Sequence, residues 1–256
     1  MKQIVNKVMV GIVVAVVLTG CNLVTFVEEE TFTLPVEGHR SLEVMHDEGE
    51  VTITGEEGLE EIIVDVRYEV LGEELEEAET FYQSNTSISL ESEGEVAKLV
   101  TSIRRGSEKE QANIHLDIRT PSNYPIQYRQ NEGGLIVSNF QSDLEIQHGS
   151  GALTITDVTG DVRLTDGAGK ATFERIDGKL QLNINSGATT IQESTGDLSL
   201  TAGSGDVGIN DHSGNITLRS GSGDVEILAV DGDVTILETR GGKLELDGIS
   251  GEVITP

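Results

Sequence analysis

Side chains that could support catalysis or bind a metal are few or scattered in this sequence. Cys21 is the only cysteine, which excludes a disulfide framework or a thiolate metal site. The histidines show no ligand spacing and are expected to be ordinary surface or turn residues: His39, His46, His115, His148 and His212. Carboxylates are abundant, but in so acidic a chain they form the default solvated surface. We therefore expect no catalytic residue and no cofactor.

Aspartates that recur directly after a turn residue offer a second possible chemistry, calcium binding. Calcium-binding nonapeptide repeats carry a Gly-Gly-x-Gly-x-Asp unit, and this sequence departs from it. Lys179 and Asn215 also interrupt one column of these aspartates. We therefore expect the aspartates to bind turn backbone amides. Asp206 and Asp224 remain the candidates for calcium.

The first 21 residues have the order of a bacterial export signal. Lys2 and Lys7 precede an apolar run from Val8 to Leu18, which is shorter than the roughly 20 residues that a bilayer crossing needs. The sequence Leu18-Thr19-Gly20-Cys21 resembles the lipobox of bacterial lipoproteins. We expect residues 1–20 to be a cleaved signal peptide and Cys21 to carry the lipid. Residues 21–40 would then be a tether on an extracytoplasmic protein, in the outer membrane if the cell is Gram-negative.

Charge restricts the remaining partners. The formal net charge is −28, with 45 acidic and 17 basic residues. Loss of residues 1–20 would remove two of those bases, Lys2 and Lys7. Such a chain is repelled by nucleic acid and by anionic lipid head groups. We therefore expect the protein to attach to the membrane through the lipid on Cys21, and we expect no nucleic acid to bind.

A nine-residue repeat dominates the second half of the chain. In the ten units from Gly151 to Gly232 the third and fifth positions are apolar, with Thr189 as the exception, and polar residues alternate with them. This alternation predicts a short strand with one buried face in each unit. The units begin at Gly151, Gly160, Gly169, Gly178, Gly187, Gly196, Gly205, Gly214, Gly223, Gly232 and Gly241.

One such unit cannot fold alone. Ordering nine residues costs on the order of 9 to 18 kcal/mol, while burying two aliphatic side chains returns about 3 to 6 kcal/mol. Neighbouring units must therefore stack into a solenoid. The eighth position is apolar in some units, as at Val158 and Ile176, and glycine in others, as at Gly167 and Gly203. We infer 18-residue coils of two strands each, in a flattened two-sheet β-solenoid over residues 114–256.

The region before the repeat is more acidic and less regular. Residues 41–113 still contain alternating segments, such as Val51-Thr52-Ile53-Thr54, and are expected to form an irregular β region that caps the solenoid. Within it, Leu75, Ala78 and Tyr82 have helical spacing, which favours one short acidic helix over 73–83. The expected fold class is therefore all-β, with a possible single helix.

The residues also carry a family resemblance. The Gly-Asp-Val-x-Leu unit at 160–164, the Ser-Gly-Asp-Val turns at 204–207 and 222–225, and Ile118-Arg119-Thr120-Pro121 resemble a bacterial putative-adhesin family of unknown function, made of β-strand repeat proteins of the cell envelope. The similarity covers roughly residues 40–256. It implies a solenoid fold and an extracytoplasmic location, and it brings no catalytic residue.

These observations favour a non-catalytic surface interaction or adhesion scaffold with an envelope or surface protein or glycan as partner. The alternative is an accessory component of an envelope-stress or envelope-homeostasis system. An enzyme acting on cell-wall polysaccharide is third, because all turns between Gly151 and Gly241 have one length. Without an insertion, no loop would build a substrate cleft.

Overall fold

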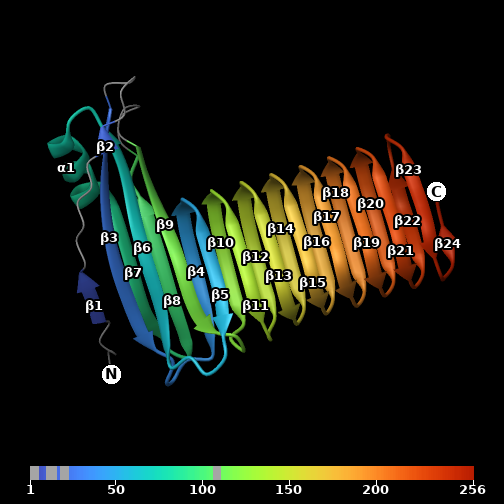
Figure 1. The fold of residues 1–256 in the computed structure, drawn as a ribbon, viewed down its shortest axis with the longest axis horizontal. Helices are drawn as coiled ribbons and strands as arrows, with labels where there is room; N and C mark the ends of the chain where they lie inside the picture. The colour runs from blue at the N-terminus through green and yellow to red at the C-terminus, as the bar shows by residue number, and fades with distance from the viewer. Residues whose placement is uncertain (1–5, 10–15, 18–22, 106–110) are drawn as a thin grey trace.

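The computed structural model describes residues 6–9, 16–17, 23–105 and 111–256. It is a rod of two facing β-sheets with the N-terminal segments at one end and the C-terminal coil at the other (Figure 1). We call the 13-stranded sheet sheet A and the 11-stranded sheet sheet B. From residue 111 onward the chain passes alternately between them, as the solenoid prediction requires.

The regular part of the rod is a parallel stack in both sheets. In sheet B its strands are β10 (Ile126–Glu132), β12 (Leu144–Ser150), β14 (Val162–Ala168), β16 (Leu180–Ser186), β18 (Leu198–Ser204), β20 (Ile216–Ser222), β22 (Val234–Thr239) and β24 (Val253–Ile254). In sheet A they are β11 (Leu135–Phe140), β13 (Leu153–Thr159), β15 (Ala171–Asp177), β17 (Thr189–Thr195), β19 (Val207–Ser213), β21 (Val225–Asp231) and β23 (Leu244–Ile249).

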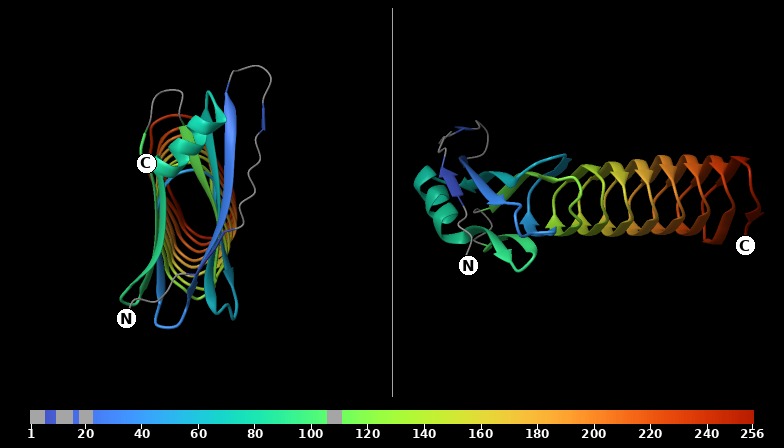
Figure 2. Two further views of the ribbon diagram at one scale, coloured as in Figure 1. Left: turned by 90° about the vertical axis from the view of Figure 1, so that its left-hand side faces the viewer. Right: turned by 90° about the horizontal axis from the view of Figure 1, so that it is seen from below.

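Register confirms the inferred 18-residue coil with two strands. Ile146 pairs with Leu164 and Leu164 with Leu182 in sheet B, while Ile155 pairs with Phe173 in sheet A. From Leu135 to Ile236 the third and fifth positions point inward and are almost fully buried, so each of these coils adds layers to one continuous core. Figure 2 shows this stack of coils end-on and from the side.

The two sheets differ in how their strands end. Sheet A strands place a non-glycine residue in the left-handed region at the seventh position of each unit: Asn139, Asp157, Arg175, Glu193, Asp211 and Ala229. This conformation interrupts the alternation, so that the seventh side chain is exposed and the eighth is buried, as at Val158 and Ile176. Sheet B strands keep the alternation. The difference explains why an apolar eighth residue occurs only in units that form sheet A strands.

The turn glycines stack because a side chain would not fit. Gly196 has φ +104°, and a Cβ there would overlap the carbonyl group of Gly178 in the preceding coil. The predicted lattice is wrong at its last member. Gly242, not Gly241, stacks on Gly223, because the register between β20 and β22 shifts after Leu218 and leaves Leu237 as an extra exposed residue.

The stack begins earlier than the expected residue 114. Strands β4 (Ser41–Glu48) and β5 (Val51–Glu56) form a first coil, with Leu42 paired with Ile126 and Val51 with Leu135. A long insertion then separates this coil from the next one. It contains β6 (Glu61–Gly72), α1 (Leu75–Asn85), β7 (Thr86–Glu93), β8 (Val96–Ile103) and β9 (Gln111–Pro121). The expected boundary at 113 and 114 lies inside β9.

The insertion extends both sheets beyond the first coil. β8 pairs in parallel with β4, and β9 pairs in parallel with β5. Outside them the pairing becomes antiparallel, in β7 with β8, β6 with β9, and β3 (Val24–Pro35) with β6. The short strands β1 (Asn6–Met9) and β2 (Val16–Val17) pair with β3. Residues 21–40 are thus not a free tether from residue 24 onward, because β3 alternates inward-facing Phe32 and Leu34 with polar residues.

The expected helix is present as α1 and lies against the N-terminal end of the rod (Figure 2). Ala78 and Phe81 of α1 pack with Phe26, Val70 and Ala112 in a small second core. Glutamates in the first turn favour the helix electrostatically. The helix and β3 therefore close the end that the regular coils leave open.

Candidate functional site

The residues singled out from the sequence are Cys21, the aspartates Asp206 and Asp224, and the histidines. Cys21 lies outside the described residues. Asp206 and Asp224 occupy one turn column, in which the Oδ1 of Asp206 accepts the backbone N–H of Asp224 at 2.9 Å and the Oδ1 of Asp224 accepts that of Lys243 at 2.7 Å. These carboxylates tie each turn to the next coil, as the backbone-amide interpretation predicts. In the part of the chain that the structure describes, no cluster of three or more His, Cys, Asp or Glu could hold a metal ion.

The interpretation of the histidines as surface or turn residues is wrong for His46, His148 and His212, whereas His39 lies in the turn before β4 but is buried there. His39, His46, His148 and His212 are buried, with exposed fractions of 2–6%. The reason is positional: His46 and His148 occupy the inward seventh position of sheet B strands, and His212 the buried eighth position of a sheet A unit. They belong to the interior of the rod and cannot contact an external ligand there.

His148 forms a fully buried ion pair. Its Nδ1 lies 2.7 Å from Oδ1 of Asp166 on the next strand, and its Nε2 lies 2.8 Å from the carbonyl oxygen of Gly133. Burial lowers the pKa of His148, but the hydrogen bonds to Asp166 and Gly133 outweigh it and the pKa is raised. An oxygen atom lies at each ring nitrogen, an arrangement that favours the protonated imidazole because only that form can donate from both nitrogens.

His46 lies in the same interior row and behaves in the opposite way. Its Nδ1 lies 2.8 Å from Oγ1 of Thr101, and its Nε2 has no hydrogen-bond partner among the described residues. Burial lowers the pKa of His46 to about 4, so the ring is neutral at pH 7. Gln130 lies between the two histidines and satisfies turn carbonyls at Gly49 and Glu132.

A second buried polar group lies near α1. Tyr68 and Tyr82 both donate hydroxyl hydrogen bonds to Glu30, at 3.4 and 3.2 Å, and their rings make an edge-to-face contact with centroids 4.9 Å apart. Burial and the charge of Glu30 raise the pKa of both tyrosines. These contacts fix β3 and β6 beneath the helix, which is a structural role.

The outer faces of the two sheets differ in charge. We define the A face and the B face as the fourth- and sixth-position side chains of the coils from β5 to β23 and from β4 to β22. On the A face threonine is the most frequent residue, with four acids and no base: Glu174, Glu226, Glu245 and Asp247. The B face has three acids and three bases: Glu43, Glu145 and Glu238 with Arg129, Arg163 and Arg219. The B face is neutral on a chain of charge −28.

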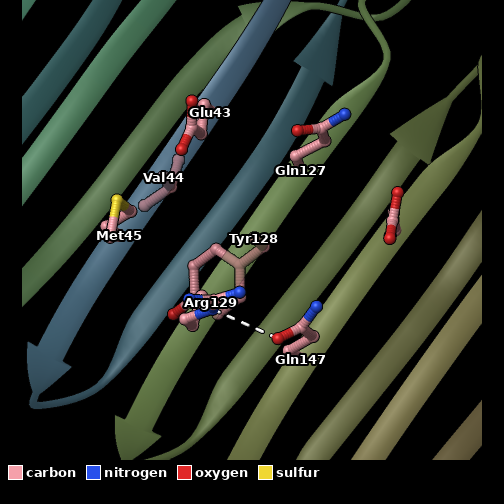
Figure 3. Close-up of a pocket in the computed structure, with 8 residues that line it drawn as sticks. Glu43, Val44, Met45, Gln127, Tyr128, Arg129 and Gln147 are labelled. Carbon is pink, nitrogen blue, oxygen red and sulfur yellow. Dashed lines mark hydrogen bonds between the residues drawn. The ribbon is translucent and has the colours of Figure 1, made fainter.

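Two shallow hollows adjoin each other on the B face. The first, of about 110 Å³, lies over β4, β10 and β12 and is lined by Glu43, Gln127, Arg129 and Gln147 among others (Figure 3). The second, of about 270 Å³, continues over β10, β12, β14 and β16. Both are lined by Gln127 and Glu145, so they form one polar track that runs across the strands.

Two arginine–glutamine pairs order this track. Arg129 Nε donates to Oε1 of Gln147 at 3.1 Å, and an Arg163 guanidinium N–H donates to Oε1 of Gln181 at 3.0 Å. Each bond joins neighbouring coils and holds two planar groups whose other N–H groups remain available for hydrogen bonds. The track therefore presents fixed donors and acceptors on an open surface.

A larger hollow, of about 420 Å³, lies over β3, β6, β9 and β5 on sheet A. Its polar groups are largely bonded to one another. Asp65 accepts from Thr31 at 2.6 Å and from Arg119 at 2.9 Å, and His115 Nδ1 accepts the backbone N–H of Glu50 at 3.1 Å. Such internal pairing leaves fewer groups for a ligand than the B-face track does.

Sequence reasoning missed the B-face residues. They share a signal, since Gln127, Glu145, Arg163 and Gln181 hold the fourth position, and Arg129 and Gln147 the sixth, of alternate units. Separating the 18-residue coil into its two strands would have placed them on one face.

A two-sheet parallel β-solenoid with a helical N-terminal cap defines the class of fold. The chain belongs to the Toastrack DUF4097 family, whose model matches residues 39–253. The resemblance to β-strand repeat proteins is thereby confirmed. No curated protein matches the chain.

Three solved structures match most of the chain at low sequence identity. One is described as a putative adhesin from Parabacteroides distasonis, with 11% identity, a TM-score of 0.49, and coverage of 88% of this chain and 96% of that chain. Another is a putative adhesin from Parabacteroides merdae, with 9% identity, a TM-score of 0.42, and coverage of 89% and 96%. A third is a putative lipid binding protein from Parabacteroides distasonis, with 10% identity, a TM-score of 0.40, and coverage of 89% and 97%. The family assignment rests on the sequence match alone.

Among the described residues, no helix combines the length and apolar character needed to cross a bilayer.

Proposed function

We propose that this protein is a lipid-anchored, extracytoplasmic scaffold that binds a surface partner through the side of its solenoid and catalyses no reaction. The observation that carries this proposal is the uniformity of the coils. From Gly151 to Gly232 the turn glycines recur every nine residues and stack coil on coil. Enzymatic solenoids need protruding loops to enclose a substrate, whereas uniform coils provide flat, rigid faces.

Anchoring through Cys21 is consistent with the direction in which the chain runs along the rod. Residue 24 begins β3 at the capped end, and the regular coils extend from there to the opposite end (Figure 1). A lipid on Cys21 would hold the cap near the membrane and direct the coils away from it. Several acyl chains on one residue give stable attachment where a single chain is marginal.

The anchor is tested by replacing Cys21 with Ala in cells fed a labelled fatty acid. We expect the label on the wild-type protein and none on the variant, which should also leave the membrane fraction or accumulate as the uncleaved precursor. Ser84→Ala, at an exposed position of α1, is the control and should keep the label. Labelling of the Cys21→Ala chain would refute lipidation at this residue.

The scaffold role is tested by photo-cross-linking in living cells. A cross-linker at Thr165 samples the B face, and one at Thr172 samples the A face. Capture of a foreign surface or matrix component supports adhesion. Capture of a membrane protein of the same cell supports the envelope-homeostasis role instead. Hydrolysis or cleavage of cell-wall polymers by the purified protein would contradict the non-catalytic proposal.

A further inference from the structure

We propose that the polar track on the B face binds an uncharged polysaccharide, laid across the strands of sheet B. This inference rests on the proposed function, which it deepens by naming the face and the chemistry of the partner. The track is the run of side chains over β4, β10, β12, β14 and β16 that lines the two adjoining hollows.

Charge is the first argument for an uncharged partner. The chain carries 45 acidic residues and a formal net charge of −28, so its overall electrostatic field repels a polyanion. A polycation would be attracted to the acidic A face, whereas the strand side chains of the B face balance acids and bases. The turn aspartates Asp143 and Asp161 line the edge of the second hollow, where the Oδ1 of each accepts a backbone N–H of the next coil. The B face is therefore where a neutral ligand meets the least competition from charge.

The chemistry of the side chains is the second argument. Amide, guanidinium and carboxylate groups can each form paired hydrogen bonds with neighbouring hydroxyls, and the track is built from these three groups. The Arg129–Gln147 and Arg163–Gln181 pairs hold their planar groups before any ligand arrives. Such order reduces the entropy that binding must overcome.

The lack of an apolar centre argues against a protein partner. Stable protein interfaces centre on buried aromatic or aliphatic anchors. Met45 and Leu237 are the apolar side chains of the B face, and they lie at its opposite ends on β4 and β22. Between them every outward side chain on the face is polar.

The shape of the track argues for a polymer over a small sugar. The hollows are open and hold about 110 and 270 Å³, below the size of pockets that enclose a small ligand. Strands in a sheet recur about every 4.8 Å, so equivalent side chains form a ladder along the rod. An extended chain can contact several rungs together, and its affinity then comes from many weak contacts.

Affinity electrophoresis of the full, detergent-solubilised protein tests this inference. The gels contain mixed-linkage β-glucan, galactomannan or dextran as neutral probes, and polygalacturonate as the charged control. We expect retardation by at least one neutral polysaccharide and none by polygalacturonate.

Matched variants locate the site. The triple replacement Gln127→Ala, Gln147→Ala and Gln181→Ala should weaken retardation at least tenfold. The A-face control, with Thr154→Ala, Thr172→Ala and Thr190→Ala, should bind as the wild type does. Arg163→Lys keeps the charge but loses the planar fork, and should weaken binding severalfold. Melting temperatures close to that of the wild type show that these replacements on the outer faces leave the fold intact.

The outcomes separate this inference from the proposed function. Equal retardation of the B-face variant and the wild type overturns the assignment of the track. Absence of retardation by every neutral polysaccharide, together with cross-linking of a protein in cells, overturns the polysaccharide inference and leaves the scaffold role standing. Absence of any partner in both experiments contradicts both.

Discussion

The capped end and the regular coils of this protein reach stability by different means. In the coils each strand repeats its neighbour, so one local solution is copied every 18 residues in parallel register. At the capped end the chain uses long antiparallel pairs, such as β3 with β6, and a helix that has its own small core. Repetition therefore makes the rod long and uniform, while the irregular insertion gives it an end.

The largest expected effect contrasts the two cores. Phe173 is fully buried in the coils, and Phe173→Ala should lower the free energy of unfolding by about 3–5 kcal/mol. Phe81→Ala removes an aromatic ring from the small core under α1, and should release the helix locally while the coils stay folded. Chemical denaturation and hydrogen exchange measure the two effects. Equal global destabilisation by both changes would erase the contrast between cap and coils.

The second prediction concerns pH where the cap meets the coils. The pKa of His46 is about 4 in the folded protein, against 6.5 for an unperturbed histidine. Between pH 6.5 and 4 the unfolded chain therefore binds a proton that the folded chain does not bind. The free energy of unfolding falls by up to roughly 3 kcal/mol as the pH drops through this range.

His46→Gln should remove this part of the acid sensitivity, because glutamine does not bind a proton in this pH range. The inward position accepts glutamine, since Gln130 occupies the paired position on β10. The opposite sign applies to His148, whose raised pKa stabilises the fold below pH 6.5 and loses that contribution as pH rises through the raised value. Unfolding free energies of wild type, His46→Gln and His148→Gln across pH 4–9 measure both. Identical pH profiles for the three proteins would contradict these assignments.

The third prediction compares turn glycines. Gly196→Ala combines a positive φ with a backbone overlap, and should cost at least about 2 kcal/mol. Gly38, in a turn before β4, also has a positive φ of +92°, but a Cβ added there would meet no atom within 4 Å. Gly38→Ala should therefore cost only about 1 kcal/mol. Melting temperatures of the two variants give the ranking, and a larger loss for Gly38→Ala would reverse the interpretation.

The smallest expected effect is a gain in stability. Ala229 has φ +53°, in the left-handed region that costs non-glycine residues about 1 kcal/mol. Ala229→Gly should thus stabilise the coils by up to about 1 kcal/mol. Ala112→Gly, in β9 of the cap, should instead destabilise by a similar amount because a buried methyl is lost from an extended strand. Destabilisation by Ala229→Gly would show that this bend is not strained.

The regular coils could be predicted from the sequence because every unit repeats the same evidence. Glycine spacing, alternation and the two kinds of eighth position together define two strands per coil. The error at Gly241 arose where one extra residue, Leu237, shifts the register by one position. The sequence carries a signal of this shift, because the third and fifth residues counted from Gly241 are Lys243 and Glu245, whereas those counted from Gly242 are Leu244 and Leu246.

The cap was harder to predict because its contacts are distant in sequence. β3 pairs with β6 although the whole first coil lies between them in the chain, and the inward-facing Glu30 of β3 obscures the alternation of Phe32 and Leu34. The burial of His46 and His148 was missed for a related reason. Single polar residues at inward positions read as surface unless the strand register is known. The B-face track likewise appears only when alternate units are assigned to separate sheets.

Measuring the distance between two labelled coils along the B face is the most direct test of the stacked rod, on which all of these interpretations depend. With Cys21 replaced by Ser, spin labels are placed at Gln127 and either Ser199 or Thr235, which lie in one row of sheet B. At about 4.8 Å per strand, the two distances should be about 19 and 29 Å. Distances that fail to grow in proportion to the number of coils would contradict the solenoid and every face defined on it.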